Sequence, residues 1–173
     1  MKHLTMAQLE AGLEEIRQSP QDKGVLKLIV RRPQENAREV LQTGELDLTE
    51  GLVGDTWKTR GSSRTADGSS HPDMQLNIMN SRVAALVAQE ENRWQLAGDQ
   101  LFIDLDLSDE NLPAGTRLEI GSAVIEVTAQ PHNGCKKNCR KVRLRRDGIC
   151  KFAARKTASP ARHQCQSHSG RRD

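Results

Sequence analysis

The apolar positions near the N-terminus predict one amphipathic helix. Residues 6–17 place Met6, Leu9, Leu13 and Ile16 three or four positions apart, with charged residues between them. Apolar residues at this spacing share one face of an α-helix. We therefore expect a short helix that packs its apolar face on the rest of the protein.

Three further segments have the patterns of strands. Residues 24–32 are rich in Val, Leu and Ile and stop at Pro33, which cannot continue a ladder of hydrogen bonds. Residues 75–79 form a short, mostly apolar run. Residues 100–107 alternate, with apolar residues on one face and acidic residues on the other, which predicts a half-buried strand.

A second helix and a hairpin complete the predicted elements. Ser81 is placed to cap a helix whose apolar face holds Val83, Leu86 and Val87. Residues 116–128 contain two apolar runs around Gly-Ser, the pattern of a β-hairpin with glycine at the first turn position. Several short strands with a few short helices favour a mainly-β, barrel-like fold.

The periodic pattern ends at Lys137. Residues 138–173 hold eleven Lys or Arg and two Asp, which leaves 15 basic and 21 acidic residues in 1–137, so the net charge of +3 combines an acidic body with a basic tail. Few large apolar residues remain in the tail. Burial cannot repay the entropy of ordering it, and we expect it to be largely disordered. We divide the chain into an N-terminal helix and lead-in at 1–23, a domain at 24–137 and this tail.

The expected cellular location depends on two kinds of segment, a signal peptide and a membrane span. The N-terminal residues have no apolar region of the kind found in signal peptides, and no run approaches the roughly 18 apolar residues of a membrane span. We expect a cytoplasmic protein without a membrane partner. A secreted disulfide framework would staple the body of the fold, whereas the cysteines lie in the last quarter of the chain, so we expect free thiols. They are Cys135, Cys139, Cys150 and Cys165.

Several motifs together carry a family resemblance. GLVGDTW at 51–57, QLNIMN at 75–80 and GDQLFIDLDLSDENLPAGTRLEIGSAVIEVTAQPHNGCKK at 98–137 stand in the order typical of one family. From about Gly24 to Lys137 the chain resembles a MOSC domain, named for the C-terminal domain of molybdenum cofactor sulfurase. The resemblance implies a β-barrel-rich fold with a cleft that holds the molybdenum cofactor (molybdopterin) through its pterin and phosphate.

The resemblance also implies chemistry for Cys135. In the family, one cysteine near the end of the barrel is thought to carry sulfur or to bind molybdenum, and Cys135 occupies that place. Some small members reduce N-hydroxylated compounds, which implies a small-molecule substrate or a sulfur donor, and an electron-transfer partner. Binding of pyridoxal phosphate is a further family-level description.

The tail departs from the family pattern. Members typically continue after CKK with RFGxDA, FVNSP and GKxLRLRGINA segments, which are absent here. Read one base later, the codons for residues 155–165 permit Gly-Lys-Gln-Leu-Arg-Leu-Arg-Gly-Ile-Asn-Ala. The same shift permits Glu-Arg-Phe-Gly-x-Asp-Ala-Met at residues 140–148 and accommodates an Asn-Ser/Leu-Pro-like run at residues 151–160. Lys136, Lys137 and Asn138 have A-rich codons, where one extra base would displace the frame. We hypothesise that 138–173 is an out-of-frame tail.

The loop at residues 131–137 (PHNGCKK) contains the candidate catalytic residues. Cys135 is followed by Lys136 and Lys137, and nearby positive charge favours the reactive thiolate. The soft thiolate also suits a sulfur-rich molybdenum centre, which makes Cys135 the candidate metal ligand. His132 is a candidate proton shuttle, with a structural histidine as the alternative. Asn133 and Lys136 are candidate cofactor-binding residues.

A second group of candidates lies upstream. Arg32 and Arg38 can grip an anionic phosphate through bidentate donors, and each is equally consistent with a solvated surface residue. Gly54 and Asp55 lie in a loop at residues 45–57 that turns tightly, where glycine supplies positive φ and Asp caps the backbone. The resemblance implies that this loop lies along the cofactor cleft, so both are candidate cofactor-binding residues.

Three other interpretations stay open. Cys135 and Cys139, with distant histidines, suggest a zinc site, but the spacing is poor. The basic tail suggests contact with nucleic acid phosphates, but it lacks interleaved aromatic residues, so we expect no specific nucleic acid partner. The chain is also consistent with an inactive, truncated remnant or a binding module without catalysis, because a displaced tail would remove the last elements that pack on the barrel. Other zinc-ligand candidates are His132, His163, Cys165 and His168.

Overall fold

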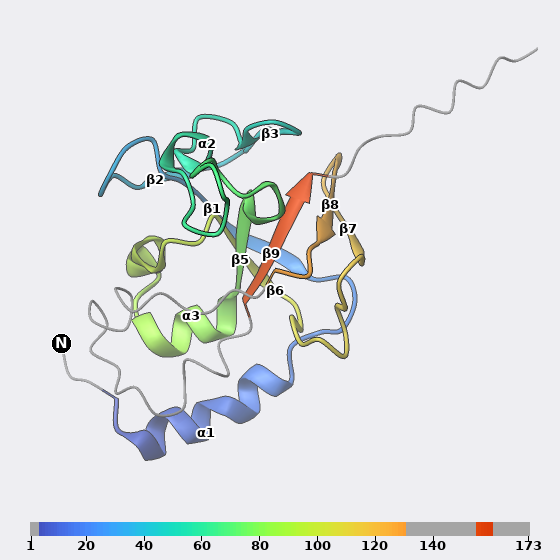
Figure 1. The fold of residues 1–173 in the computed structure, drawn as a ribbon. Coiled ribbons are helices and arrows are strands. Elements are labelled where there is room, and N and C mark those ends of the chain that lie inside the picture. The colour runs from blue at the N-terminus through green and yellow to red at the C-terminus, as the bar shows by residue number, and fades with distance from the viewer. Residues whose placement is uncertain (1–3, 131–154, 161–173) are drawn as a thin grey trace, which may run out of the picture.

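A seven-stranded mixed sheet forms the centre of the computed structural model, which describes residues 4–130 and 155–160 (Figure 1). The strand order is β2-β1-β6-β5-β9-β8-β7, and β3 and β4 form a separate pair. The strands are β1 (Val25–Arg31), β2 (Glu39–Leu41), β3 (Leu46–Asp47), β4 (Gly51–Leu52), β5 (Leu76–Asn80), β6 (Leu101–Asp104), β7 (Arg117–Ile120), β8 (Ala123–Val127) and β9 (Arg155–Pro160). The helices are α1 (Met6–Arg17), α2 (Trp57–Arg60) and α3 (Ser81–Ala88), with 3₁₀ turns η1 (Pro72–Met74) and η2 (Glu91–Ala97).

Among the described residues, the expectation of a mainly-β, barrel-like fold with a few short helices is met only in part. The fold is mixed α/β, with comparable shares of helix and strand, and the sheet is open because β2 and β7 lie at opposite ends of the strand order. A barrel closes only when the first and last strands pair. Here helices supply the second layer that covers the sheet, so the sheet does not need to curl on itself.

Strands β5 and β6 pair in parallel, with α3 in the connection between them. The predicted strand at 75–79 and the helix after it are confirmed, but the helix cap is Asn80 rather than Ser81. Asn80 accepts hydrogen bonds from the backbone N–H groups of Arg82 (2.8 Å) and Val83 (3.2 Å). Its Nδ2 also donates to the Leu105 carbonyl at 2.7 Å, which ties the start of the helix to the strand after it.

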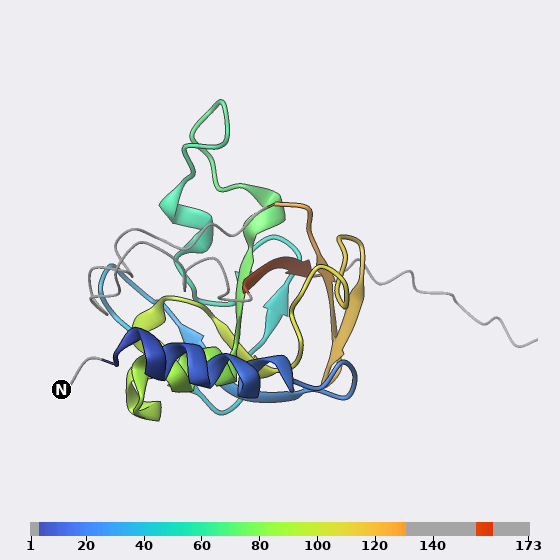
Figure 2. The ribbon, with the colours of Figure 1, turned by 90° about the horizontal axis from the view of Figure 1, so that it is seen from below.

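The predicted N-terminal helix is confirmed as α1. Thr5 caps it in a reciprocal arrangement with Gln8. The helix packs on α3 at Gly12, where an added Cβ would lie only 2.5 Å from Leu86 Cδ1. Figures 1 and 2 show α1 and α3 together on one side of the sheet. Helix α1 therefore contributes to the same helical layer as α3.

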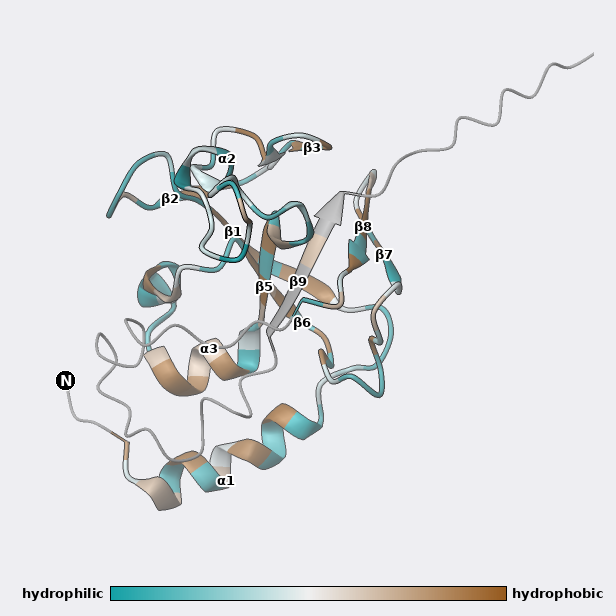
Figure 3. Cartoon of the chain, viewed as in Figure 1, coloured by the Kyte–Doolittle hydropathy of each residue, from teal (hydrophilic) through white to brown (hydrophobic). Residues whose placement is uncertain are grey.

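The core has two parts, because β6 is a central strand covered on both faces. One cluster includes Leu76, Ile103 and Ile125, and the other is built around Phe102 and Met79. Figure 3 shows the apolar residues concentrated in the central strands and in α3. The expectation of a half-buried strand at 100–107 is wrong at its centre, because Phe102 is fully buried under the second cluster.

The hairpin predicted at residues 116–128 is confirmed as β7 and β8, which pair Ile120 with Ala123. Gly121 has a φ of 62° at the first turn position, as a tight hairpin turn requires. The loop at residues 45–57 is partly ordered as the β3–β4 hairpin. Figure 2 shows the connection between α2 and η1 extending away from the sheet.

Residues 155–160 are an ordered part of the segment 138–173 that we expected to be largely disordered. These six residues form β9, which is antiparallel to β5 on one side and to β8 on the other. Ala158 is fully buried between Leu76 and Val127. Pairing on both edges compensates for the lack of large apolar residues in this segment. The remainder of the predicted tail, 138–154 and 161–173, lies outside the described residues.

Candidate functional site

A buried ion pair between Arg32 and Asp55 joins the end of β1 to the turn after β4. Arg32 Nη2 lies 2.6 Å from Asp55 Oδ1, and Arg32 Nε donates to Asp55 Oδ2 at 2.8 Å. The side chains are 4% and 0% exposed. The two segments also meet through the backbone, where Thr56 N–H donates to the Arg32 carbonyl at 3.0 Å. The carboxylate and the guanidinium group therefore form a bidentate pair away from solvent.

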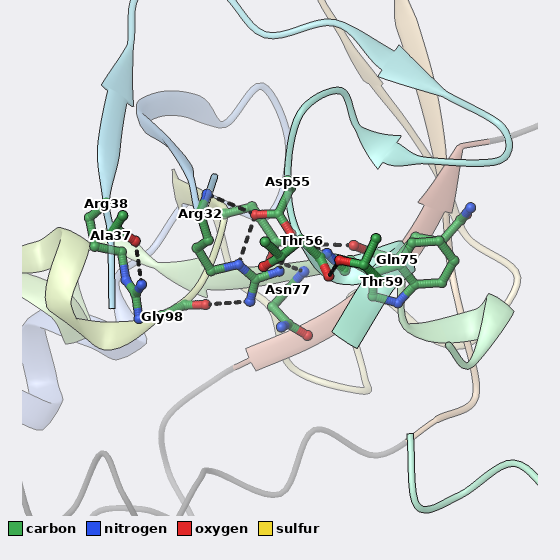
Figure 4. Close-up of polar contacts among 11 residues, drawn as sticks. Arg32, Ala37, Arg38, Asp55, Thr56, Thr59, Gln75, Asn77 and Gly98 are labelled. Carbon is green, nitrogen blue, oxygen red and sulfur yellow. Dashed lines mark hydrogen bonds and ion pairs between the residues drawn. The ribbon is translucent and has the colours of Figure 1, made fainter. Parts of the chain in front are cut away.

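The Arg32–Asp55 pair makes further hydrogen bonds within the fold. Asp55 also accepts from the backbone N–H groups of Arg32 and Trp57, each at 2.9 Å. Arg32 Nη1 donates to the Gly98 carbonyl at 3.0 Å (Figure 4). The alternative that Arg32 is a solvated surface residue is wrong. Its Nε–Nη2 edge, the one expected to grip a phosphate, lies against Asp55.

Arg38 is close to this pair but lacks an acidic partner among the described residues. Its Nη1 donates to the Ala37 carbonyl, while its Nε is buried without a hydrogen-bond partner in the described part of the chain. The pKa of Arg38 is lowered mainly by burial, then by the positive charge of Arg32, while Asp55 acts in the opposite direction. Arg38 is therefore a partly desolvated cation beside a charge-neutral pair.

Gly54 has a structural role in the turn that positions Asp55. Its φ is +76°, and an added Cβ would lie 2.9 Å from Arg31 Nη1. The expectation that glycine supplies positive φ in this loop is confirmed here and at Gly51. A side chain at position 54 would strain the backbone and press on Arg31.

Asn77 on β5 is a site residue that the sequence reasoning missed. Its backbone N–H donates to Gln100 Oε1 at 2.9 Å, and its carbonyl accepts from Gln100 N–H at 3.0 Å. The residue is 9% exposed, and its side-chain Oδ1 is buried with no partner among the residues that the structure describes. The available signal was a polar residue inside the apolar run at 75–79.

Segment 98–100 connects Asn77 with the ion pair. Gly98 accepts from Arg32, and Gln100 bonds to Asn77 two residues later. In the view of Figure 4, Arg32 and Asp55 lie between Arg38 and Asn77. We call Arg32, Arg38, Asp55 and Asn77 the polar cluster. It combines a neutral ion pair with one buried donor and one buried acceptor that have no partner among the described residues.

The candidate residues of the 131–137 loop lie outside the described residues. This applies to His132, Asn133, Cys135 and Lys136. The segment before this loop is held in place at Thr128, whose Oγ1 donates to the Asp73 carbonyl at 2.7 Å. The structure thus brings Arg32, Arg38 and Asp55 together, while the predictions for the cysteine loop stay predictions.

Within residues 4–130 and 155–160, no group of three or more His, Cys, Asp or Glu side chains is arranged to hold a metal ion. The predicted zinc ligands Cys139, His163, Cys165 and His168 lie outside these ranges, as does Cys135. In the same ranges, no helix has both the length and the apolar character needed to cross a membrane.

Comparisons with known proteins found no match for this chain. This holds for family models, for curated proteins and for solved structures.

Proposed function

We propose that this protein binds the molybdenum cofactor, with Arg38 facing its phosphate and Cys135 acting as sulfur carrier or molybdenum ligand. The observation that carries the proposal is the buried, unpartnered Nε of Arg38 beside a neutralised Arg32–Asp55 pair. A phosphate would supply the missing acceptor and the missing negative charge. The MOSC-like motifs support the same class of ligand.

The polar cluster fits this cofactor in both charge and hydrogen bonding. The cofactor carries an anionic phosphate and a pterin with N–H donors. The orphaned donor of Arg38 suits the first, and the orphaned acceptor of Asn77 suits the second. When bound, the cofactor would supply a molybdenum centre able to exchange electrons or sulfur.

The residues of the chain have separate parts in this proposal. Arg38 binds the anion, and the Arg32–Asp55 pair keeps the ends of β1 and β4 in place, since it ties both segments together through side chain and backbone. Cys135 would bind molybdenum as a thiolate or would carry transferred sulfur, and His132 would transfer a proton. The substrate class proposed for such a site is a small N-hydroxylated compound or a sulfur donor.

Metal content of the purified full-length protein tests the proposal. We would express the wild type, Arg38→Ala and Cys135→Ala in medium with molybdate and measure molybdenum by mass spectrometry and pterin by fluorescence after oxidation. We expect both in the wild type, with loss of molybdenum from each variant. Arg117→Ala is the matched control, because Arg117 is an exposed arginine paired with Glu126 on β7 and β8.

Two outcomes would contradict the proposal: wild-type protein without molybdenum and pterin, or variants that retain both. Stoichiometric zinc that depends on Cys139 would instead support the zinc interpretation. Zinc content should therefore be measured on the same samples.

A second candidate, an inactive remnant or a simple binding module, is favoured by the register of β9. Lys156 is paired with Ile78 and Pro160 with Ile125, and both isoleucines are fully buried. A strand in the middle of a sheet ordinarily carries apolar residues at such positions, and proline cannot donate to a ladder. This candidate predicts a protein that is free of molybdenum, poorly soluble, or both.

A further inference from the structure

The buried carboxamide of Asn77 has a feature that fold stability does not explain. Both backbone groups of Asn77 bond to Gln100. These contacts do not involve the Asn77 side chain. The side-chain Oδ1 is buried without a partner among the described residues, and the residue is 9% exposed. A buried acceptor without a hydrogen bond opposes folding, because it has lost its water.

Neighbouring buried amides show the contrast. Gln100 uses both ends of its carboxamide: Oε1 accepts from Asn77 N–H, and Nε2 donates to the Gln75 carbonyl at 3.1 Å. Gln75 Nε2 in turn donates to the Leu48 carbonyl at 2.8 Å. These two side chains hold β5, segment 98–100 and the β3–β4 hairpin together. The carbonyl end of Asn77 takes no part in that network.

We propose that Asn77 is a ligand-binding residue whose Oδ1 accepts a hydrogen bond from the pterin ring of the cofactor. This inference rests on the proposed function and adds to it the residue that recognises the heterocycle. Pterins present amino and ring N–H donors, and an amide oxygen held on a central strand is a fixed acceptor for them. Arg38 would then contact the phosphate of the ligand, and Asn77 would contact its pterin ring.

The proposal predicts opposite effects of one substitution on stability and on binding. Asn77→Leu replaces the orphaned acceptor with an apolar side chain that has the same branching and the same number of non-hydrogen atoms. We expect the thermal midpoint of the ligand-free protein to rise by a few degrees, because a buried unsatisfied group is removed. We expect affinity for a pterin without a phosphate, measured by fluorescence titration, to fall by about tenfold or more.

Asn111→Leu is the matched control. The Asn111 amide donates to the Asp106 carbonyl at 2.8 Å and to the Gln21 carbonyl at 3.0 Å, so its replacement breaks satisfied hydrogen bonds. It should lower the thermal midpoint and leave pterin affinity unchanged. Arg38→Ala should weaken binding of inorganic phosphate and leave the phosphate-free pterin bound.

The outcomes separate this inference from the proposed function. If the wild type and Asn77→Leu bind the pterin equally, or if Asn77→Leu lowers the thermal midpoint as Asn111→Leu does, the role of Asn77 is overturned while cofactor binding through Arg38 stands. If the wild type binds neither pterin nor phosphate and contains no cofactor on purification, both are overturned. Weaker pterin binding with unchanged phosphate binding in Asn77→Leu supports the inference.

Discussion

Arg32 and Arg38 lie six positions apart in the chain, and they differ in how many of their guanidinium nitrogens have partners within the fold. Arg32 is buried, and its guanidinium group contacts Asp55 and Gly98. Arg38 is half-buried, has a lowered pKa and keeps an orphaned Nε. Each guanidinium nitrogen of Arg32 has a partner within the fold, whereas Arg38 Nε is buried without one among the described residues. In our proposal Arg38 is therefore the one of the two that contacts the ligand.

We expect the largest effect on stability from breaking the Arg32–Asp55 ion pair. Asp55→Ala leaves the Arg32 guanidinium buried without its carboxylate and removes the acceptor of two backbone N–H groups. We expect the free energy of unfolding to fall by about 3–5 kcal/mol, the usual cost of breaking a buried pair. Urea denaturation followed by circular dichroism measures this, and a loss below 1 kcal/mol would mean that the pair does not hold the fold.

A lysine in place of each arginine sharpens the comparison. Arg32→Lys keeps the charge but cannot reproduce the bidentate contact, so we expect a loss of about 2 kcal/mol in the free energy of unfolding. Arg38→Lys removes no side-chain contact to a carboxylate and should leave stability nearly unchanged. Equal losses in the two variants would show that the two arginines do not differ as described.

The smallest effect on stability is expected from Arg38→Met, which removes a partly desolvated charge and keeps much of the side-chain volume. We expect the free energy of unfolding of the ligand-free protein to stay within about 0.5 kcal/mol of the wild type or to rise. Arg117→Met, on the exposed face of β7, serves as the control. A large destabilisation by Arg38→Met would assign Arg38 a structural role.

Local patterns in the sequence were sufficient for much of the fold. The helix at 6–17 and the hairpin at 116–128 depend on periodicity and on glycine at a turn, both of which are properties of adjacent residues. The strand at 75–79 was also found. The parallel pairing of β5 with β6 was missed, because it depends on how α3 covers the sheet and not on either strand alone.

Strand β9 was missed for a different reason. Its residues lack the alternation of large apolar side chains, and its pairing is decided by the facing edges of β5 and β8. The codons of Ala158 and Pro160, read one base later, permit leucine at both positions, which are paired with buried residues of β8. The out-of-frame tail stays a prediction, and sequencing the source DNA across codons 136–138 tests it. An A run one base shorter would support it, and an unchanged run would count against it.

The sequence could propose the arginines of the polar cluster but could not tell them apart. Asp55 is 23 positions from Arg32, and only the fold shows that it saturates one arginine and leaves the other. Asn77 was overlooked because a polar residue in a strand pattern is ordinarily assigned to the solvent face. Burial and hydrogen-bond satisfaction, which are properties of the folded chain, supply what the pattern lacks.

Phosphate titration tests the central claim most directly. We would follow the thermal midpoint of the wild type, Arg38→Met and Arg117→Met as inorganic phosphate is added at constant ionic strength. A ligand that binds only the folded state raises the midpoint with concentration. The account predicts a concentration-dependent rise in the wild type and in Arg117→Met, and none in Arg38→Met. An equal rise in all three proteins, or no rise in the wild type, would contradict it.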